Sequence, residues 1–403
     1  MRLRSLALLP TTTRGIFLAT AGVLFLLLLI GAWRAYPLLD DVTAANSAGD
    51  DWLSYKRYAL SILHEGLSLP AVRGSYYAPA GFLYSYFIAA VFALTGENST
   101  HVYLVQAALL ALSVGLTAAA FQPYLSITAR AIYFWALALT LFLDVYLVYT
   151  FRLLSENLTL FLLPIFYLTL LRAFESQSAF LTACAGAALG LCALSRPNLV
   201  LVAPATAVLL FWRLRPRRTK YPLIFLLWFG VIFSLLPLRN YVAGNQLSVP
   251  VFTMKAHWQT PALDTTGPPT LAGFGRNAFA VATFYARRVL FCSGFTLLEL
   301  PFYWLRPHWL VMWGGAFTFA RRALRRRCLK FWELFALSFI PVYLLPIIAL
   351  AQISNYGVRM IVPVIPIVLL LGVRALSPPD LFSAGARDQD LKFSARSEGS
   401  RAA

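Results

Sequence analysis

Apolar runs that are each close to the length needed to cross a membrane recur along most of the chain. A helix of about 20 residues spans the hydrocarbon core of a bilayer. Only 12% of the residues are charged, whereas a soluble domain carries about a quarter. The pattern predicts an all-α polytopic membrane protein with about ten transmembrane helices. The runs lie at 15–33, 102–120, 131–148, 157–172, 178–195, 197–212, 222–238, 303–320, 332–350 and 357–375.

The orientation of these spans follows from the basic residues between them. Lys and Arg are enriched in cytoplasmic loops, where they also face anionic lipid. The net charge of +18 is therefore attributed to orientation and lipid contact, and no nucleic-acid partner is expected. Counting crossings predicts that Arg130 and Arg172 are cytoplasmic, whereas Glu97, Glu156 and Arg196 lie outside. The three basic clusters are Arg2, Arg4 and Arg14; Arg213, Arg215, Arg217, Arg218 and Lys220; and Arg321, Arg322, Arg325, Arg326, Arg327 and Lys330.

The same count divides the chain into a membrane part and a tail. Residues 1–375 form the predicted transmembrane domain, which includes two external segments, 34–101 and 239–302. The first of these begins and ends on the same face, so its apolar run at 79–96 is expected to be re-entrant or to lie along the membrane. Residues 376–403 are polar and without periodicity, which predicts a disordered cytoplasmic tail.

The first external segment concentrates carboxylates beside an amphipathic pattern. Within Asp51–Gly66, apolar residues recur at helical spacing, with Lys56 and Arg57 on the other face. This pattern predicts a helix in the plane of the interface. Asp50 and Asp51 are consistent either with a helix cap or with a divalent-cation site. The spacing identifies no further metal ligand, and no cofactor is required.

Two consecutive stretches here resemble a known family. GDDWLSYKRYALSILHEG, followed by YYAPAGFLYSYFIAAVFALTG, is similar to the first-loop signature of GT-C membrane glycosyltransferases. The similarity is to the branch that uses lipid-phosphate sugars, such as protein O-mannosyltransferases and lipid A aminoarabinose transferases. One departure is Tyr77-Ala78, which stands where some relatives have a basic residue before the proline. The matching positions, in order, are Asp51, Tyr55, Ala59, Gly66, Pro79 and Gly96.

Four later motifs continue this resemblance, which covers roughly residues 14–375. In the family's second external loop an Arg precedes by four residues an acidic residue that opens a helix, as Arg152 precedes Glu156. The others resemble an Arg-Pro element, an Arg-Asn-Tyr element and the last helix entrance. They are Ser195-Arg196-Pro197-Asn198, Pro237-Leu238-Arg239-Asn240-Tyr241 and Tyr356-Gly357-Val358-Arg359.

The resemblance implies transfer of a sugar from a polyprenyl-phosphate donor to an acceptor hydroxyl, with inversion. Such a reaction needs a base for the acceptor proton and cations for the departing phosphate, to which arginine offers a planar fork of donors. In this hypothesis Asp51 is the base, and Glu156 holds hydroxyl groups of the acceptor or of the sugar. The predicted phosphate ligands are Arg239, Arg359, Lys56, Arg57 and Arg196; the predicted supporting residues are Asp50, Tyr55, Arg152 and Tyr77.

The expected setting is the cell membrane, the inner or cytoplasmic one in a bacterium, with the active site on the external or periplasmic face. The partners are the lipid-linked donor, membrane lipids, and a glycan, lipid or protein acceptor; the sequence does not specify the sugar. Two alternatives stay open, a lipid-linked oligosaccharide flippase and an oligosaccharide ligase. A carrier is expected to place ionisable residues midway along its helices, whereas these charges gather at helix ends.

Overall fold

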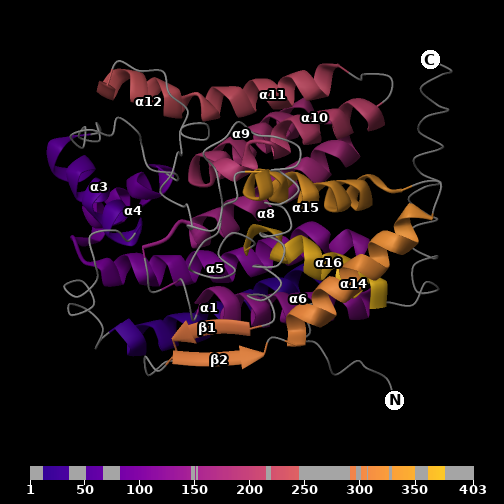
Figure 1. The fold of residues 1–403 in the computed structure, drawn as a ribbon, viewed down its shortest axis with the longest axis horizontal. Helices are drawn as coiled ribbons and strands as arrows, with labels where there is room; N and C mark the ends of the chain where they lie inside the picture. The colour runs from indigo at the N-terminus through magenta and orange to yellow at the C-terminus, as the bar shows by residue number, and fades with distance from the viewer. Residues whose placement is uncertain are drawn as a thin grey trace.

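The computed structural model is a bundle of helices (Figure 1). It describes residues 12–35, 51–66, 82–146, 150, 153–214, 219–244, 291–295, 301–305, 307–325, 329–349 and 362–376, with some side chains in these ranges excepted. The described part is helical apart from one antiparallel hairpin and confirms the all-α class. The helices are α1 (Thr13–Ala35), α3 (Asp51–Glu65), α4 (Phe82–Thr95), α5 (Ser99–Phe121), α6 (Ile127–Leu141), α8 (Glu156–Ser176), α9 (Ala179–Ser195), α10 (Val202–Arg213), α11 (Lys220–Phe233), α12 (Leu235–Gly244), α14 (Pro307–Leu324), α15 (Phe331–Ala349) and α16 (Ile365–Leu376).

Every predicted apolar run overlaps at least one described helix. Four helical stretches are long and apolar enough to cross a membrane: Thr13–Ile30, Ser99–Tyr124, Glu156–Ser176 and Lys220–Arg239. Six shorter apolar helices accompany them in the described part of the chain. The multi-pass character is thereby supported, and the number of crossings stays a prediction.

One element was not expected from the sequence. The hairpin pairs β1 (Phe291–Phe295) with β2 (Pro301–Leu305). It occupies the first residues of the run at 303–320, so α14 begins only at Pro307. Proline is favoured at the start of a helix because its missing N–H has no intrahelical partner there.

Glycines allow the helices to approach closely. A Cβ at Gly186 of α9 would lie 2.3 Å from the carbonyl oxygen of Phe225 in α11, and one at Gly315 of α14 would lie 2.7 Å from the Cα of Gly372 in α16. Small residues commonly let helix backbones meet in this way in membrane proteins. The interfaces α9–α11 and α14–α16 are therefore fixed by backbone contact.

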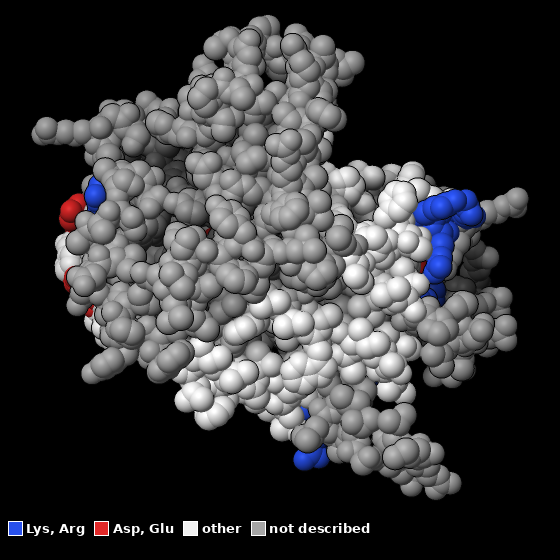
Figure 2. Space-filling view, turned by 60° about the horizontal axis from the view of Figure 1, so that its bottom comes forward, with Lys and Arg blue, Asp and Glu red and all other residues white. Residues whose placement is uncertain are grey.

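One end of the bundle, here called the basic end, contains residues from the predicted cytoplasmic basic clusters. Side-chain contacts hold the segments at this end together. Tyr124 after α5 donates to Glu175 of α8 over 2.6 Å, and Tyr221 of α11 donates to the Gln177 carbonyl over 2.6 Å. Arg213 donates to the carbonyl of Leu329. In the space-filling view the charged side chains lie towards the edges of the described surface, with an uncharged white face between them (Figure 2).

The opposite end, here called the first-loop end, carries α3 and α4 (Figure 1). The imidazole of His64, near the end of α3, lies 2.8 Å from the Glu97 carboxylate just after α4. Tyr84 of α4 bonds Gln106 in the second turn of α5. Helix α4 thus packs on α3 and on the first two turns of α5.

Candidate active site

A buried ion pair joins two of the predicted site residues. Glu156 is the first residue of α8 and Arg196 directly follows α9, so the antiparallel arrangement of these helices brings the two together. A guanidinium nitrogen of Arg196 donates to Glu156 Oε1, and the exposed fractions of the side chains are 7% and 0%. Because an unpaired buried charge is costly, each residue neutralises the other. Arg152, which precedes Glu156 by four residues, lies outside the described residues.

More polar groups surround this ion pair. The hydroxyl of Tyr343 in α15 is hydrogen-bonded to Arg196 and Asn198. Asn157 is fully buried; its Oδ1 accepts from Thr150 over 3.3 Å, and its Nδ2 has no partner among the residues that the structure describes. The start of α8, the end of α9 and the second half of α15 therefore meet around one polar cluster inside an apolar bundle.

A chain of contacts leads from this cluster to the first-loop helices. Gln106 Nε2 of α5 donates to the Thr150 carbonyl over 2.7 Å, and Gln106 Oε1 accepts from Tyr84 of α4. The ring of Tyr84 meets that of Tyr55 in α3 edge to face, with centroids 5.1 Å apart. The predicted residue Tyr55 is thus connected to the surroundings of Glu156. Gln106 and Tyr84 were not among the predicted site residues, although a glutamine inside the apolar run 102–120 indicates buried polar contacts.

A second convergence involves Arg239 of α12. Its half-buried side chain is hydrogen-bonded to Tyr86 of α4 and lies near Tyr58 of α3. Burial raises the pKa of Tyr58, and the nearby charges of Arg239 and Arg57 oppose this rise. The Tyr58 hydroxyl therefore stays protonated at neutral pH, within the electrostatic influence of two guanidinium groups.

The remaining predicted residues are placed less fully. Asp51 is the first residue of α3, but its side chain lies outside the described residues, as do Asp50, Tyr77 and Arg359 altogether. Lys56 is described and half-buried on α3. Within the described ranges no group of three His, Cys, Asp or Glu side chains could hold a metal ion.

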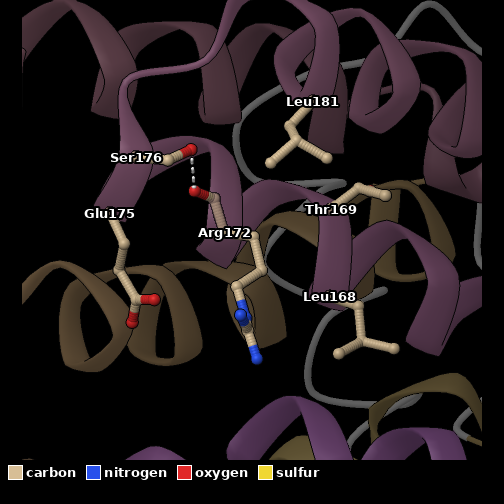
Figure 3. A pocket seen from close by; sticks show the side chains of 6 residues that line it. All are labelled: Leu168, Thr169, Arg172, Glu175, Ser176 and Leu181. Carbon is tan, nitrogen blue, oxygen red and sulfur yellow. Dashed lines mark hydrogen bonds between the residues drawn. The ribbon is translucent and has the colours of Figure 1, made fainter.

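The described pocket is at the other end of α8. It is shallow, has a volume of about 510 Å³ and is shown in Figure 3. It therefore belongs to the basic end rather than to the predicted site. Its lining residues are Leu168, Thr169, Arg172, Glu175, Ser176 and Leu181.

Comparison with known proteins bears on the family and the fold. The family model described as dolichyl-phosphate-mannose-protein mannosyltransferase matches residues 79–239. No curated protein matches the sequence. The solved structures that resemble the chain include ArnT from Cupriavidus metallidurans bound to undecaprenyl phosphate, with TM-score 0.54 and 14% identity over 94% of this chain and 64% of that one.

Two further structures are similar. One is the apo state of the same ArnT, with TM-score 0.50 and 17% identity over 91% of this chain and 62% of that one. The other is the apo oligosaccharyltransferase of Archaeoglobus fulgidus, with TM-score 0.49 and 14% identity over 88% and 50% of the two chains. The chain thus spans less than two thirds of the length of these proteins. Residues 79–239 thus match this family model, and the chain shares the helical, multi-pass membrane fold of the ArnT structures.

Proposed function

We propose that the chain transfers a sugar from a polyprenyl-phosphate donor to an acceptor hydroxyl, with inversion, at the first-loop end of the bundle. The observation that carries this proposal is the approach of Arg239 of α12 to α3 and α4, where it is hydrogen-bonded to Tyr86 and its charge, with that of Arg57, acts on Tyr58. α12 and α3 are far apart in the sequence, and both arginines were predicted to bind the donor phosphate. Guanidinium groups brought to one end of the bundle in this way are suited to a phosphate.

In the proposed reaction the lipid phosphate departs as C1 of the sugar is attacked. Negative charge then develops on the phosphate oxygens, and cations already in place stabilise it without rearrangement. Tyr86 holds Arg239, and the protonated hydroxyl of Tyr58 supplies a further hydrogen-bond donor to the same place. Lys56 and Arg359 remain proposed as additional phosphate ligands.

Asp51 is the proposed base for the acceptor hydroxyl. It precedes Tyr58 by seven residues in α3, so helical periodicity places the two backbone positions on one face, about 10 Å apart. This spacing leaves room for a sugar between a base at Asp51 and a phosphate near Tyr58. Asp50 and Tyr77 stay proposed as supporting residues.

Glu156 is proposed to hold hydroxyl groups of the acceptor or of the donor sugar. Its ion pair with Arg196 keeps the carboxylate charged and fixed in direction. We therefore propose that Arg196 positions Glu156 instead of contacting the phosphate. Gln106 and Tyr84 connect this pair to α3, so both proposed halves of the site share one packed framework.

The kind of donor is supported by the comparisons. The matching family model is described by a dolichyl-phosphate mannose reaction, and the ArnT structure was determined with undecaprenyl phosphate. A polyprenyl-phosphate sugar is thus the proposed donor, delivered on the external face of the cell membrane. A glycan, a lipid or a protein could supply the acceptor hydroxyl.

Incubation of the purified protein with labelled polyprenyl-phosphate sugars tests the proposal. We expect the label to leave the lipid and to appear on an acceptor, with free polyprenyl phosphate as the second product. The Arg321→Gln variant, which changes an exposed arginine at the basic end, serves as a control and should transfer the label as the wild-type protein does. Movement of intact donor across vesicle membranes, with no cleavage of any donor tested, would contradict the proposal and would indicate a carrier.

A further inference from the structure

The pocket of Figure 3 lies about 30 Å from the proposed site along α8. Glu156 begins this helix and Ser176 ends it, and each residue adds about 1.5 Å. The pocket is formed by the last two and a half turns of α8 and by Leu181 of α9. No role in sugar transfer has been assigned to any of its residues.

The lining of the pocket changes from apolar to charged along the helix. Leu168 and Thr169 lie towards the middle of the bundle, Arg172 follows one turn later, and Glu175 and Ser176 lie at the helix end. This change takes place over about 12 Å. In a helix long enough to span the membrane, such an order matches a ligand with a polar head at the membrane surface and an apolar body in the hydrocarbon region.

The two charges of the pocket stand separately. The described residues provide no ion pair and no side-chain hydrogen bond for the exposed guanidinium of Arg172. Glu175 is held differently, because its Oε1 accepts from the Tyr124 hydroxyl, whose ring stacks on Trp332 with centroids 5.5 Å apart. This hydrogen bond fixes the position of the Glu175 carboxylate, and a neutral hydroxyl does not cancel its negative charge. In Figure 3 the side chains of Arg172 and Glu175 extend separately from neighbouring turns of α8.

We propose that this pocket binds phosphatidylethanolamine. The phosphate of the headgroup is held by Arg172, the ammonium group by Glu175, and an acyl chain lies against Leu168 and Leu181. One positive and one negative side chain complement a zwitterion, whereas a purely anionic headgroup is repelled by Glu175. The primary ammonium also donates hydrogen bonds to a carboxylate, which the quaternary ammonium of phosphatidylcholine cannot do. The proposal is independent of sugar transfer and adds a lipid site at the basic end.

Native mass spectrometry of the full chain in detergent tests this proposal. The protein is mixed with equal amounts of phosphatidylethanolamine, phosphatidylglycerol and phosphatidylcholine, and the retained lipid is identified. We expect the wild-type protein to retain phosphatidylethanolamine preferentially. Arg172→Gln should weaken this retention about tenfold, because a charge-assisted contact is lost. Glu175→Gln keeps an acceptor for Tyr124 but should abolish the preference over the other two lipids.

Three further measurements make the result specific. Arg321→Gln removes another exposed charge at the basic end without touching the pocket and should leave retention unchanged. Leu181→Trp fills the apolar part of the pocket and should displace the lipid, while Arg172 and Glu175 keep their charges. Soluble glycerophosphoethanolamine in large excess should not compete, because it lacks the acyl chains. Equal retention of the three lipids by the wild type, or retention that Arg172→Gln leaves unchanged, would overturn the proposal, and so would full competition by the soluble compound.

Discussion

Replacement of Arg196 by methionine is expected to destabilise the protein strongly. The Glu156 side chain is fully buried and that of Arg196 is 7% exposed, so the substitution removes the cation that Arg196 supplies to a carboxylate in an apolar interior. Removing one partner of a buried ion pair costs about 3–5 kcal/mol. Tyr343 offers one neutral hydroxyl nearby, which offsets only a small part of this loss. Glu156→Gln should cost less, because Arg196 is longer and lies near the helix end.

The double variant Glu156→Gln/Arg196→Met separates the charge effect from packing. Both charges are then absent and the side-chain volumes are nearly kept, so the loss should be only about 1–2 kcal/mol. The double variant is thus expected to be more stable than Arg196→Met alone. The coupling between the two positions should be about 2–3 kcal/mol, within the range measured for residues in direct contact.

Thermal unfolding in detergent can be followed with a thiol-reactive dye. Cys192 is fully buried one turn before Arg196, so its thiol becomes reactive when α8 and α9 separate. Cys184 is partly exposed and contributes to the initial signal. We expect Arg196→Met to lower Tm by about 5–10 °C. If the double variant loses the sum of the two single losses, the two charges are not coupled and the reasoning fails.

Four further predictions concern the site and the packing. Asp51→Asn should abolish transfer while the protein accumulates normally; transfer at the wild-type rate would refute its role as the base. Arg239→Gln should lower kcat/KM for the donor by about 10²-fold, and Arg239→Lys should recover part of it, because a lysine restores the charge but not the planar fork. Tyr58→Phe should act more weakly than Arg239→Gln in the same assay. Gly186→Leu should lower Tm by several degrees, because its Cβ would meet the α11 backbone, whereas Gly230→Ala has open space and should leave Tm unchanged or slightly higher.

The helices were predictable because their signals are local. The stripe formed by Tyr55, Ala59 and Ile62 is buried in α3, while Arg57 and His64 are exposed, as helical periodicity indicates. The order of apolar runs and basic clusters likewise predicted which helix ends lie together at the basic end. These patterns depend on residues a few positions apart, and tertiary packing does not override them.

The contacts of the site were less predictable because they are long-range. Arg196 is 40 positions from Glu156 in the sequence, and only the antiparallel packing of α8 and α9 brings the two together. Gln106 and Tyr84 are separated by 22 positions, and only the folding of α4 onto α5 brings them together. The hairpin formed by β1 and β2 depends on pairing between strands, and its apolar second strand continues into the run at 303–320 without a change in composition. Sequence analysis could select the charged residues of the site but not their partners.

The pairing of Glu156 with Arg196 has a consequence for the direction of the two helices. The start of a helix carries partial positive charge and its end partial negative charge, since the peptide dipoles add along the axis. Glu156 is in the first turn of α8, and Arg196 directly follows the last turn of α9. Each side chain therefore complements the helix to which it belongs as well as its partner. Exchanging the two residues would keep the ion pair but place each charge at the helix end that repels it, so the pair favours one direction of α8 and α9.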